Sequence, residues 1–266
     1  MEQPSAQAAA STYTQASVQY LDTVTAQDAA QRYKQQTYEL LAARAGDALL
    51  DAGCGPGDDV RALARLVGPT GQVTGIDFRE DVIAEARRRS ATDTNTTFEV
   101  ADIYQLPFAE GTFDGCRAER VFQHLLEPQQ ALAELIRVTR PGGRIVVGDP
   151  DWDTLIVAMP DVATSRTVTH LACDNVRHGR MGRQLYGLFQ AAGLQEVTIL
   201  PVTGMLTDFA LASELYSLRR TAEQAQQQGL LSAEAVADWL ASLEETSRAG
   251  QFFSAITGFT AYGRKP

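Results

Sequence analysis

A glycine-rich loop holds the residues whose types and spacing are best suited to binding a ligand. The apolar run Ala48-Leu49-Leu50 indicates a short buried strand, and Asp51-Ala-Gly-Cys-Gly-Pro-Gly57 follows it directly. Glycines let backbone amides approach a ligand closely, and the start of the next helix adds unpaired N–H groups and a positive dipole end. The loop therefore favours a ligand site, although glycines also form ordinary turns.

The spacing within this loop argues against a dinucleotide. The dinucleotide fingerprint GxGxxG needs a glycine at its sixth position, where this sequence has Asp58. A carboxylate at that position would repel a pyrophosphate. The ligand expected at Gly53, Gly55 and Gly57 is one without a diphosphate.

Two further acids follow the next two predicted strands. Asp77 comes directly after the strand predicted over 72–76, where a carboxylate can accept hydrogen bonds from both hydroxyls of a ribose. Asp102 follows the strand predicted over 97–100, where a carboxylate can accept a hydrogen bond from the exocyclic amine of adenine. An adenosine across these strand ends, with its tail over the glycine loop near Asp51, satisfies all of these positions.

The elements that must position these residues alternate between strand and helix. Predicted strands cover residues 48–50, 72–76, 97–100, 113–118 and 144–147. Between the first two, Val60, Leu63, Ala64 and Val67 have the spacing of one face of an amphipathic helix. Strands joined by helices at this spacing imply right-handed crossovers. We therefore predict an α/β fold with a doubly wound, mostly parallel sheet.

The motifs on these elements resemble those of the class I S-adenosylmethionine-dependent methyltransferases, especially the small-molecule group related to the ubiquinone/menaquinone C-methyltransferases. The matching segments are Leu50–Gly57, Gly75–Phe78, Ala101–Ile103, Leu106–Phe108, Phe113–Asp114 and Arg140–Arg144. The resemblance implies a Rossmann-like, seven-stranded sheet whose last strand, here 252–262, runs antiparallel to the others. It also implies S-adenosyl-L-methionine as cofactor and S-adenosyl-L-homocysteine as product.

The resemblance assigns cofactor-binding roles to residues at the strand ends. They are Asp51, Gly53, Gly55, Gly57, Asp77, Phe78, Asp102, Ile103 and Glu119. The glycines would border the methionine part, Asp77 would bind the ribose, and Asp102 and Ile103 would hold the adenine. Glu119 would line the cofactor through its backbone. The alternative for Asp77 and Asp102 is that they cap the helices that follow them.

A catalytic base is needed only if the acceptor atom carries a proton. His124 is the candidate, because imidazole titrates near neutral pH and because this region faces the methyl group in the family that the sequence resembles. Asp149 and Asp151, after the fifth predicted strand, could orient the imidazole or accept the proton. The alternative for His124 is packing at a helix start. We expect no metal site, because the pair Asp174-Asn175 does not follow a core strand.

Two segments depart from the strand–helix alternation and are expected to form a substrate cap. The first, 152–182, is predicted to be an inserted helix and loop, and the second, 207–246, a helical pair. The aromatic residues expected to line the substrate pocket are Tyr20, Trp152, Phe209 and Tyr216. The predicted divisions are an N-terminal helical segment over 1–45, the cofactor core over 46–150, cap insertions over 151–182 and 205–248, a core helix and strand over 183–204, and a final core strand over 249–266.

The composition argues against several kinds of partner. The net charge of −10 repels phosphate backbones and anionic lipids. The three cysteines have no CxxC spacing, and no segment approaches the roughly 20 apolar residues of a membrane span. We expect a cytoplasmic monomer or homodimer that binds a small-molecule acceptor, and neither nucleic acid nor membrane.

The sequence therefore predicts a methyltransferase that acts on the oxygen, nitrogen or carbon of a small organic acceptor, in secondary metabolism. Two alternatives remain open. The same fold could bind S-adenosylmethionine while catalysing a cyclisation or rearrangement, or it could form a catalytically silent methyltransferase-like subunit. The acceptor atom is not readable from the sequence, because the fold fixes the cofactor whereas the cap fixes the substrate.

Overall fold

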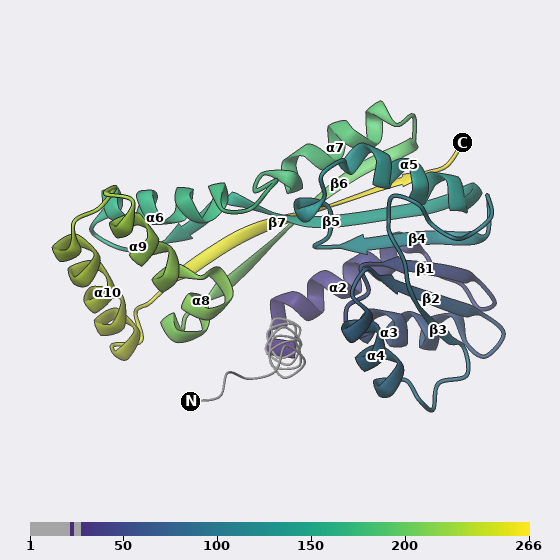
Figure 1. The fold of residues 1–266 in the computed structure, drawn as a ribbon, viewed down its shortest axis with the longest axis horizontal. Helices are drawn as coiled ribbons and strands as arrows, with labels where there is room; N and C mark the ends of the chain where they lie inside the picture. Colours follow the sequence, from purple (N-terminus) through teal and green to yellow (C-terminus); the bar gives the residue numbers. More distant parts are fainter. Residues whose placement is uncertain (1–21, 24–27) are drawn as a thin grey trace, which may run out of the picture.

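A single mixed sheet organises the protein in the computed structural model, which describes residues 22–23 and 28–266 (Figure 1). The strand order in the described part is β3-β2-β1-β4-β5-β7-β6. The strands are β1 (Ala48–Ala52), β2 (Gln72–Asp77), β3 (Thr96–Val100), β4 (Phe113–Glu119), β5 (Thr139–Val157), β6 (Gln195–Leu206) and β7 (Ser254–Arg264). Neighbouring strands from β3 to β5 pair in parallel, and β7 pairs antiparallel with both β5 and β6. The predicted fold class and the antiparallel last strand are confirmed.

Helices cover both faces of this sheet. They are α2 (Asp28–Leu41), α3 (Asp58–Val67), α4 (Glu80–Arg89), η1 (Phe122–His124), α5 (Pro128–Val138), α6 (Val162–Asp174), α7 (Met181–Ala191), α8 (Phe209–Tyr216), α9 (Leu218–Gln227) and α10 (Ala233–Arg248). The helices α2, α3 and α4 bury apolar side chains against one face, and α5 and α7 against the other (Figure 1). The sheet is therefore the middle layer of three.

The helix after the glycine loop shows how the sequence specifies these elements. Val60, Leu63, Ala64 and Val67 are buried on one side of α3, as their spacing predicts. Gly68 ends the helix in a backbone conformation with φ of 67°, and its N–H donates to the Ala64 carbonyl. The start of α3 is thereby held next to the end of β1, where a ligand-binding loop is expected.

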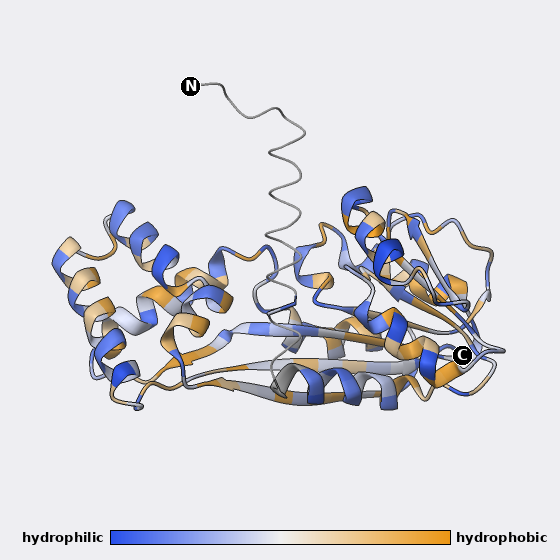
Figure 2. Ribbon diagram, turned by 90° about the horizontal axis from the view of Figure 1, so that it is seen from below, coloured by the Kyte–Doolittle hydropathy of each residue, from blue (hydrophilic) through white to orange (hydrophobic). Residues whose placement is uncertain are grey.

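The last three strands continue beyond the other four and carry the cap. β5 extends well past the predicted strand 144–147 and crosses residue 150, where the cofactor core was expected to end. β6 crosses residue 204, after which the second cap insertion was expected to begin. The helices α6, α8, α9 and α10 gather around the far end of these strands (Figure 1). Figure 2 shows apolar residues along the long strands and on the inner sides of these helices.

The second cap segment forms three helices instead of the predicted pair. Ser217 adopts a left-handed conformation with φ of 54°, which ends α8 and begins α9. Ser232 caps α10, because its side chain accepts a hydrogen bond from the Ala235 N–H. The Trp239 indole N–H donates to the Ser165 hydroxyl at 2.9 Å, which joins α10 to α6. The two cap insertions therefore share one core.

Candidate active site

The glycine loop turns sharply at the carboxyl end of β1. Gly53, Gly55 and Gly57 all have positive φ, at 75°, 53° and 84°. The N–H groups of Gly53 and Cys54 both donate to the Ile76 carbonyl at 2.8 Å, which ties the loop to β2. A side chain on Gly53 would collide with Val121, so the loop lies tightly against the segment that follows β4.

A cavity of about 1050 Å³ opens at this edge of the sheet and reaches the cap. Its lining includes seven residues that the sequence assigned to the cofactor: Gly53, Gly55, Asp77, Phe78, Asp102, Ile103 and Glu119. Asp51 and Gly57 are not among the described lining residues. Asp51 is buried below the loop, and a Cβ on Gly57 would lie 2.7 Å from the Phe98 ring.

The Asp77 carboxylate joins the glycine loop to the start of α4. One oxygen accepts a hydrogen bond from the Gly55 N–H at 3.2 Å, and the other accepts one from the Arg79 N–H at 3.0 Å. Burial raises the pKa of Asp77, although these two amides oppose the shift. Asp77 is thus held in one orientation at the rim of the cavity.

The next strand ends present surfaces that suit an adenosine. Phe78 is 79% exposed and Val100 is 47% exposed although both line the cavity. An adenine ring bound here would cover these two apolar side chains. Asp102 accepts a hydrogen bond from the Tyr104 N–H at 2.9 Å. A carboxylate that can accept hydrogen bonds from ribose hydroxyls therefore lies beside apolar side chains that can contact a purine. This combination fits S-adenosylmethionine.

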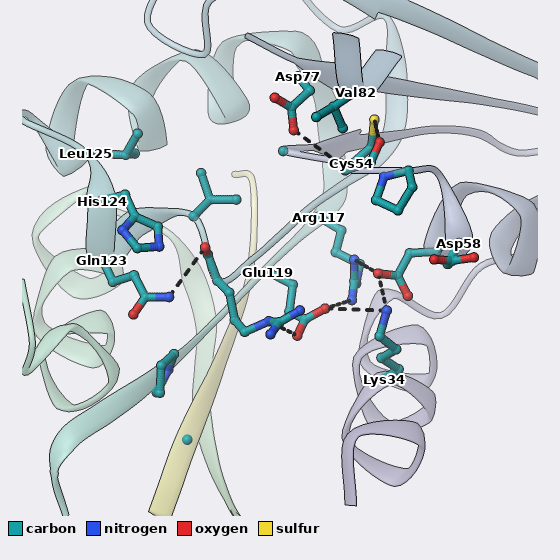
Figure 3. Close-up of a pocket in the computed structure, with 18 of the residues that line it drawn as sticks. Lys34, Cys54, Asp58, Asp77, Val82, Arg117, Glu119, Gln123, His124 and Leu125 are labelled. Carbon is teal, nitrogen blue, oxygen red and sulfur yellow. Dashed lines mark hydrogen bonds and ion pairs between the residues drawn. The ribbon is translucent and has the colours of Figure 1, made fainter. Parts of the chain in front are cut away.

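A network of buried charges borders the other end of the loop (Figure 3). Arg117 on β4 contacts Asp51 at 2.8 Å, Asp59 at 3.3 Å and Glu119 at 3.0 Å. Lys34 on α2 contacts Asp59 at 2.8 Å. Arg120 contacts Glu119 at 3.2 Å, so three cations face three carboxylates. The sequence analysis missed Arg117 because a lone arginine in a strand has no distinctive spacing.

The pKa values within this network are shifted by burial and by the neighbouring charges. Burial raises the pKa of Asp51, against the opposing charge of Arg117. The pKa of Asp59 is below its ordinary value, because Arg117 and Lys34 outweigh the effect of burial. The hydroxyl of Tyr38 also donates to Asp59. The network thus keeps Asp59 ionised beside the loop.

His124 lines the cavity from the 3₁₀ helix η1, on the side away from Lys34 and Arg117 (Figure 3). Burial and the nearby charge of Arg120 lower the pKa of His124 below its ordinary value. The imidazole is therefore neutral at pH 7 and can accept a proton.

The two aspartates considered as partners of His124 have other partners. Asp149 is fully buried, accepts a hydrogen bond from the Gln123 N–H at 3.3 Å, and has a pKa raised well above its ordinary value by burial. Asp151 pairs with Arg183. Neither is among the described cavity-lining residues, and the structure gives neither a hydrogen bond to His124.

Comparison with known proteins adds to this geometry. The family model described as "Methyltransferase domain" matches residues 43–193, which is more than half of the chain. The chain belongs to the class I S-adenosylmethionine-dependent methyltransferases. This confirms the resemblance seen in the motifs.

Relatives of this methyltransferase differ in their sequence identity to it and in how much of the chain they match. It is 43% identical over 241 residues to an uncharacterized 37.1 kDa protein in transposon TN4556 of Streptomyces fradiae, covering 90% of this chain and 69% of that protein. It is 34% identical to the demethylmenaquinone methyltransferase of Staphylococcus aureus, over 47% of this chain and 52% of that enzyme. The solved structure of the [4+2]-cyclase SpnF is 25% identical, with a TM-score of 0.51 and coverage of 89% of this chain and 81% of that one.

The cap side of the methyltransferase contains some of the predicted substrate residues. Trp152 and Tyr216 line the cavity, and their rings meet edge to face with centroids 6.3 Å apart. Phe209 packs on Phe252 in the cap core and is not among the described lining residues. Tyr20 lies outside the described residues.

Gln123 is the cap-side residue that the sequence analysis missed. Its side-chain oxygen accepts a hydrogen bond from the Trp152 indole N–H at 2.8 Å, and its backbone carbonyl accepts one from the His178 N–H at 3.0 Å. It therefore links the segment that carries His124 to β5 and to the start of α7. An isolated glutamine beside a candidate histidine offers no sequence signal for this role.

Two further structural observations concern metals and membranes. In the described part of the chain, no three His, Cys, Asp or Glu side chains come together as a metal site would require. The Asn175 side chain is bonded to Gln224 at 2.8 Å. None of the described helices combines the length and the apolar character needed to cross a bilayer.

Proposed function

We propose that this protein transfers a methyl group from S-adenosylmethionine to a small organic acceptor. The observation that carries the proposal is the single cavity that runs from the glycine loop and Asp77 to Trp152 and Tyr216 of the cap. A cofactor at the strand ends and an acceptor under the cap would share this cavity. The reacting atoms would therefore meet without leaving the protein.

In this proposal, S-adenosylmethionine supplies a methyl group bound to a positively charged sulfur. The chain's own residues bind and orient the reactants. Asp77 accepts hydrogen bonds from the ribose, Phe78 and Ile103 flank the adenine, and Asp102 accepts a hydrogen bond from its amine. Because methyl transfer needs an in-line approach, much of the rate enhancement would come from holding the two molecules in contact away from water.

His124 serves as the general base where the acceptor atom carries a proton. Its lowered pKa leaves the imidazole neutral at pH 7, so it can take the proton as the new bond to carbon forms. Gln123 holds the neighbouring backbone through its bonds to Trp152 and Asp149. Asp149 is thus a positioning residue for this segment rather than a partner of the imidazole.

The biological setting is part of the proposal. We propose a cytoplasmic location and a role in secondary metabolism, the latter because the cavity reaches under the cap and leaves room for an organic acceptor. We predict that the protein is a monomer or a homodimer.

A second candidate function is a cyclisation or rearrangement with S-adenosylmethionine bound but not consumed. The observation that favours it is the similarity to the [4+2]-cyclase SpnF over most of the chain. An assay with S-adenosylmethionine labelled on its methyl group and a small-molecule extract of the source cell separates the two. Label transferred to an acceptor supports methylation, whereas a converted substrate without label supports the second candidate.

Cofactor binding is tested first by calorimetry with S-adenosylmethionine. Replacing Asp77 by alanine removes the acceptor for two ribose hydroxyls, so we expect affinity to fall about 10- to 100-fold. The control is Glu110→Ala, which removes an acid whose side chain is 77% exposed and which is not a described cavity-lining residue. Equal affinity of wild type and Asp77→Ala would exclude the proposed cofactor site.

A further inference from the structure

The cap side of the cavity differs in charge from the cofactor side. Its described lining residues are Pro150, Trp152, Val202, Gly204, Met205, Leu206, Leu215, Tyr216, Ile256 and Gly258. All ten are uncharged, and we call the space that they line the acceptor chamber. The charged residues of the lining lie around the glycine loop, the strand ends and η1. A charged group placed deep in the chamber would lose hydration without gaining a partner.

Apolar side chains in this chamber are left partly open. Val202 and Ile256, on the same face of the sheet as Gly258, line the cavity and are only half-buried. Apolar side chains that gather in a concave site and stay uncovered are typical of a binding site for an apolar ligand.

Gly258 occupies the floor of the chamber, part-way along β7. It lies on β7, in register with Pro150 of β5 and Val202 of β6. A Cβ at this position would come no closer than 3.5 Å to another atom, and the backbone does not have positive φ. Glycine within a strand is destabilising relative to alanine. Neither backbone conformation nor packing requires a glycine here.

Two other glycines on the long strands, Gly148 and Gly263, differ in this respect. A Cβ on Gly148 would collide with the Tyr33 hydroxyl, and one on Gly263 would lie 3.0 Å from Leu194. Both are needed for packing. The absence of a side chain at Gly258 therefore leaves space in the chamber instead of space for a neighbouring element.

We infer that Gly258 determines acceptor specificity, by keeping the floor of the acceptor chamber open for a planar, uncharged and mostly apolar acceptor. Bare peptide groups at Gly258, beside the flat ring of Pro150, allow a ring system to lie on the sheet. The Trp152 indole, bonded to Gln123, places the chamber next to the segment that carries His124. This inference rests on the proposed function, because it describes the acceptor of that reaction.

The test compares two probes that share one ring system and differ in charge. At pH 7, 2-naphthol is uncharged and 2-naphthoate is an anion. Calorimetry on protein saturated with S-adenosylhomocysteine should show 2-naphthol binding about tenfold or more tightly than 2-naphthoate. Equal or tighter binding of 2-naphthoate, or no binding of 2-naphthol, would overturn the inference.

The chamber floor is tested by Gly258→Leu, which fills it with a side chain. We expect 2-naphthol affinity to fall about tenfold or more, and S-adenosylhomocysteine affinity to stay within about threefold. The control Gly187→Leu adds the same side chain on the exposed side of α7, where a Cβ meets nothing within 4 Å. This control should change neither affinity.

The outcomes separate this inference from the proposed function. Unchanged 2-naphthol binding in Gly258→Leu, with S-adenosylhomocysteine still bound, overturns the role of Gly258 and leaves the cofactor site intact. If the wild-type protein does not bind S-adenosylhomocysteine, the proposed function is refuted instead. If Gly258→Leu does not fold, Gly258→Ala should show a smaller loss of 2-naphthol affinity, and no loss would overturn the inference.

Discussion

At the scale of single residues, His124 depends on its surroundings for its chemistry. The residue is exposed at the cavity wall, and its pKa is lowered by partial desolvation and by the charge of Arg120, both of which favour the neutral ring. The sequence placed this histidine correctly after the fourth strand. It could not show that Asp149 and Asp151 bond elsewhere, because that depends on how η1 and α7 pack on β5.

The pH dependence of methyl transfer should report the state of His124. Because its pKa is lowered, the base form predominates at pH 7, and the rate should fall only as the pH drops through that lowered pKa. His124→Gln should reduce kcat about 100-fold and remove this acidic decline, because general-base assistance is lost. Rates across pH 5–8 with an acceptor that carries a proton provide the measurement.

A binding measurement and a control variant show whether the loss of rate comes from the imidazole itself. S-adenosylhomocysteine affinity of His124→Gln should remain within about threefold of wild type, since the imidazole is proposed to serve the acceptor. His170→Gln, on the exposed side of α6, is the matched control and should leave the rate unchanged. A wild-type rate in His124→Gln would remove His124 as the base.

At the scale of elements, Arg117 joins four parts of the fold at the cofactor end of the cavity. It contacts Asp51 on β1, Asp59 on α3 and Glu119 on β4, and it donates to the Thr37 hydroxyl on α2 at 2.9 Å. Its side chain is 1% exposed. The network therefore fixes α2 against the sheet while supplying the charges that border the glycine loop.

Removing this arginine should destabilise the whole protein. Arg117→Met leaves the buried carboxylate of Asp51 without a cation, while Asp59 keeps Lys34 and Glu119 keeps Arg120, so we expect a loss of about 3–5 kcal/mol in the free energy of unfolding. Urea denaturation measures this loss. Arg88→Ala, which removes an exposed ion pair on α4, should leave the urea midpoint almost unchanged. An unchanged midpoint in Arg117→Met would mean that the network does not stabilise the fold.

The elements also show which parts of the structure were predictable from the sequence. The strands and helices from β1 to α5 follow local apolar spacing, and motifs such as Gly53-Cys54-Gly55 and Asp77 mark the cofactor side. The extension of β5 was not predictable, because Pro150 and the polar residues after it interrupt the apolar run. The charge network was equally hidden, since Lys34, Asp59 and Arg117 are far apart in the chain and meet only after folding.

At the scale of the whole molecule, the long strands make the cofactor core and the cap parts of one structure. β5 contributes Ile145 and Val147 to the core cluster, and further along the same strand it contributes Leu155 and Val157 to the cap cluster. Its pairing with β7 runs from Arg144 to Val157. A cap built on continuous strands cannot unfold without breaking sheet hydrogen bonds that the core shares.

We therefore expect core and cap to unfold in a single cooperative transition. Scanning calorimetry should give a calorimetric enthalpy equal to the van't Hoff enthalpy. S-adenosylhomocysteine at about 100 times its Kd should add about 2.7 kcal/mol of stability and raise the Tm of the whole transition by roughly 5–10 °C. Two separate transitions, with the ligand shifting only one, would show instead that the cap folds independently of the cofactor core.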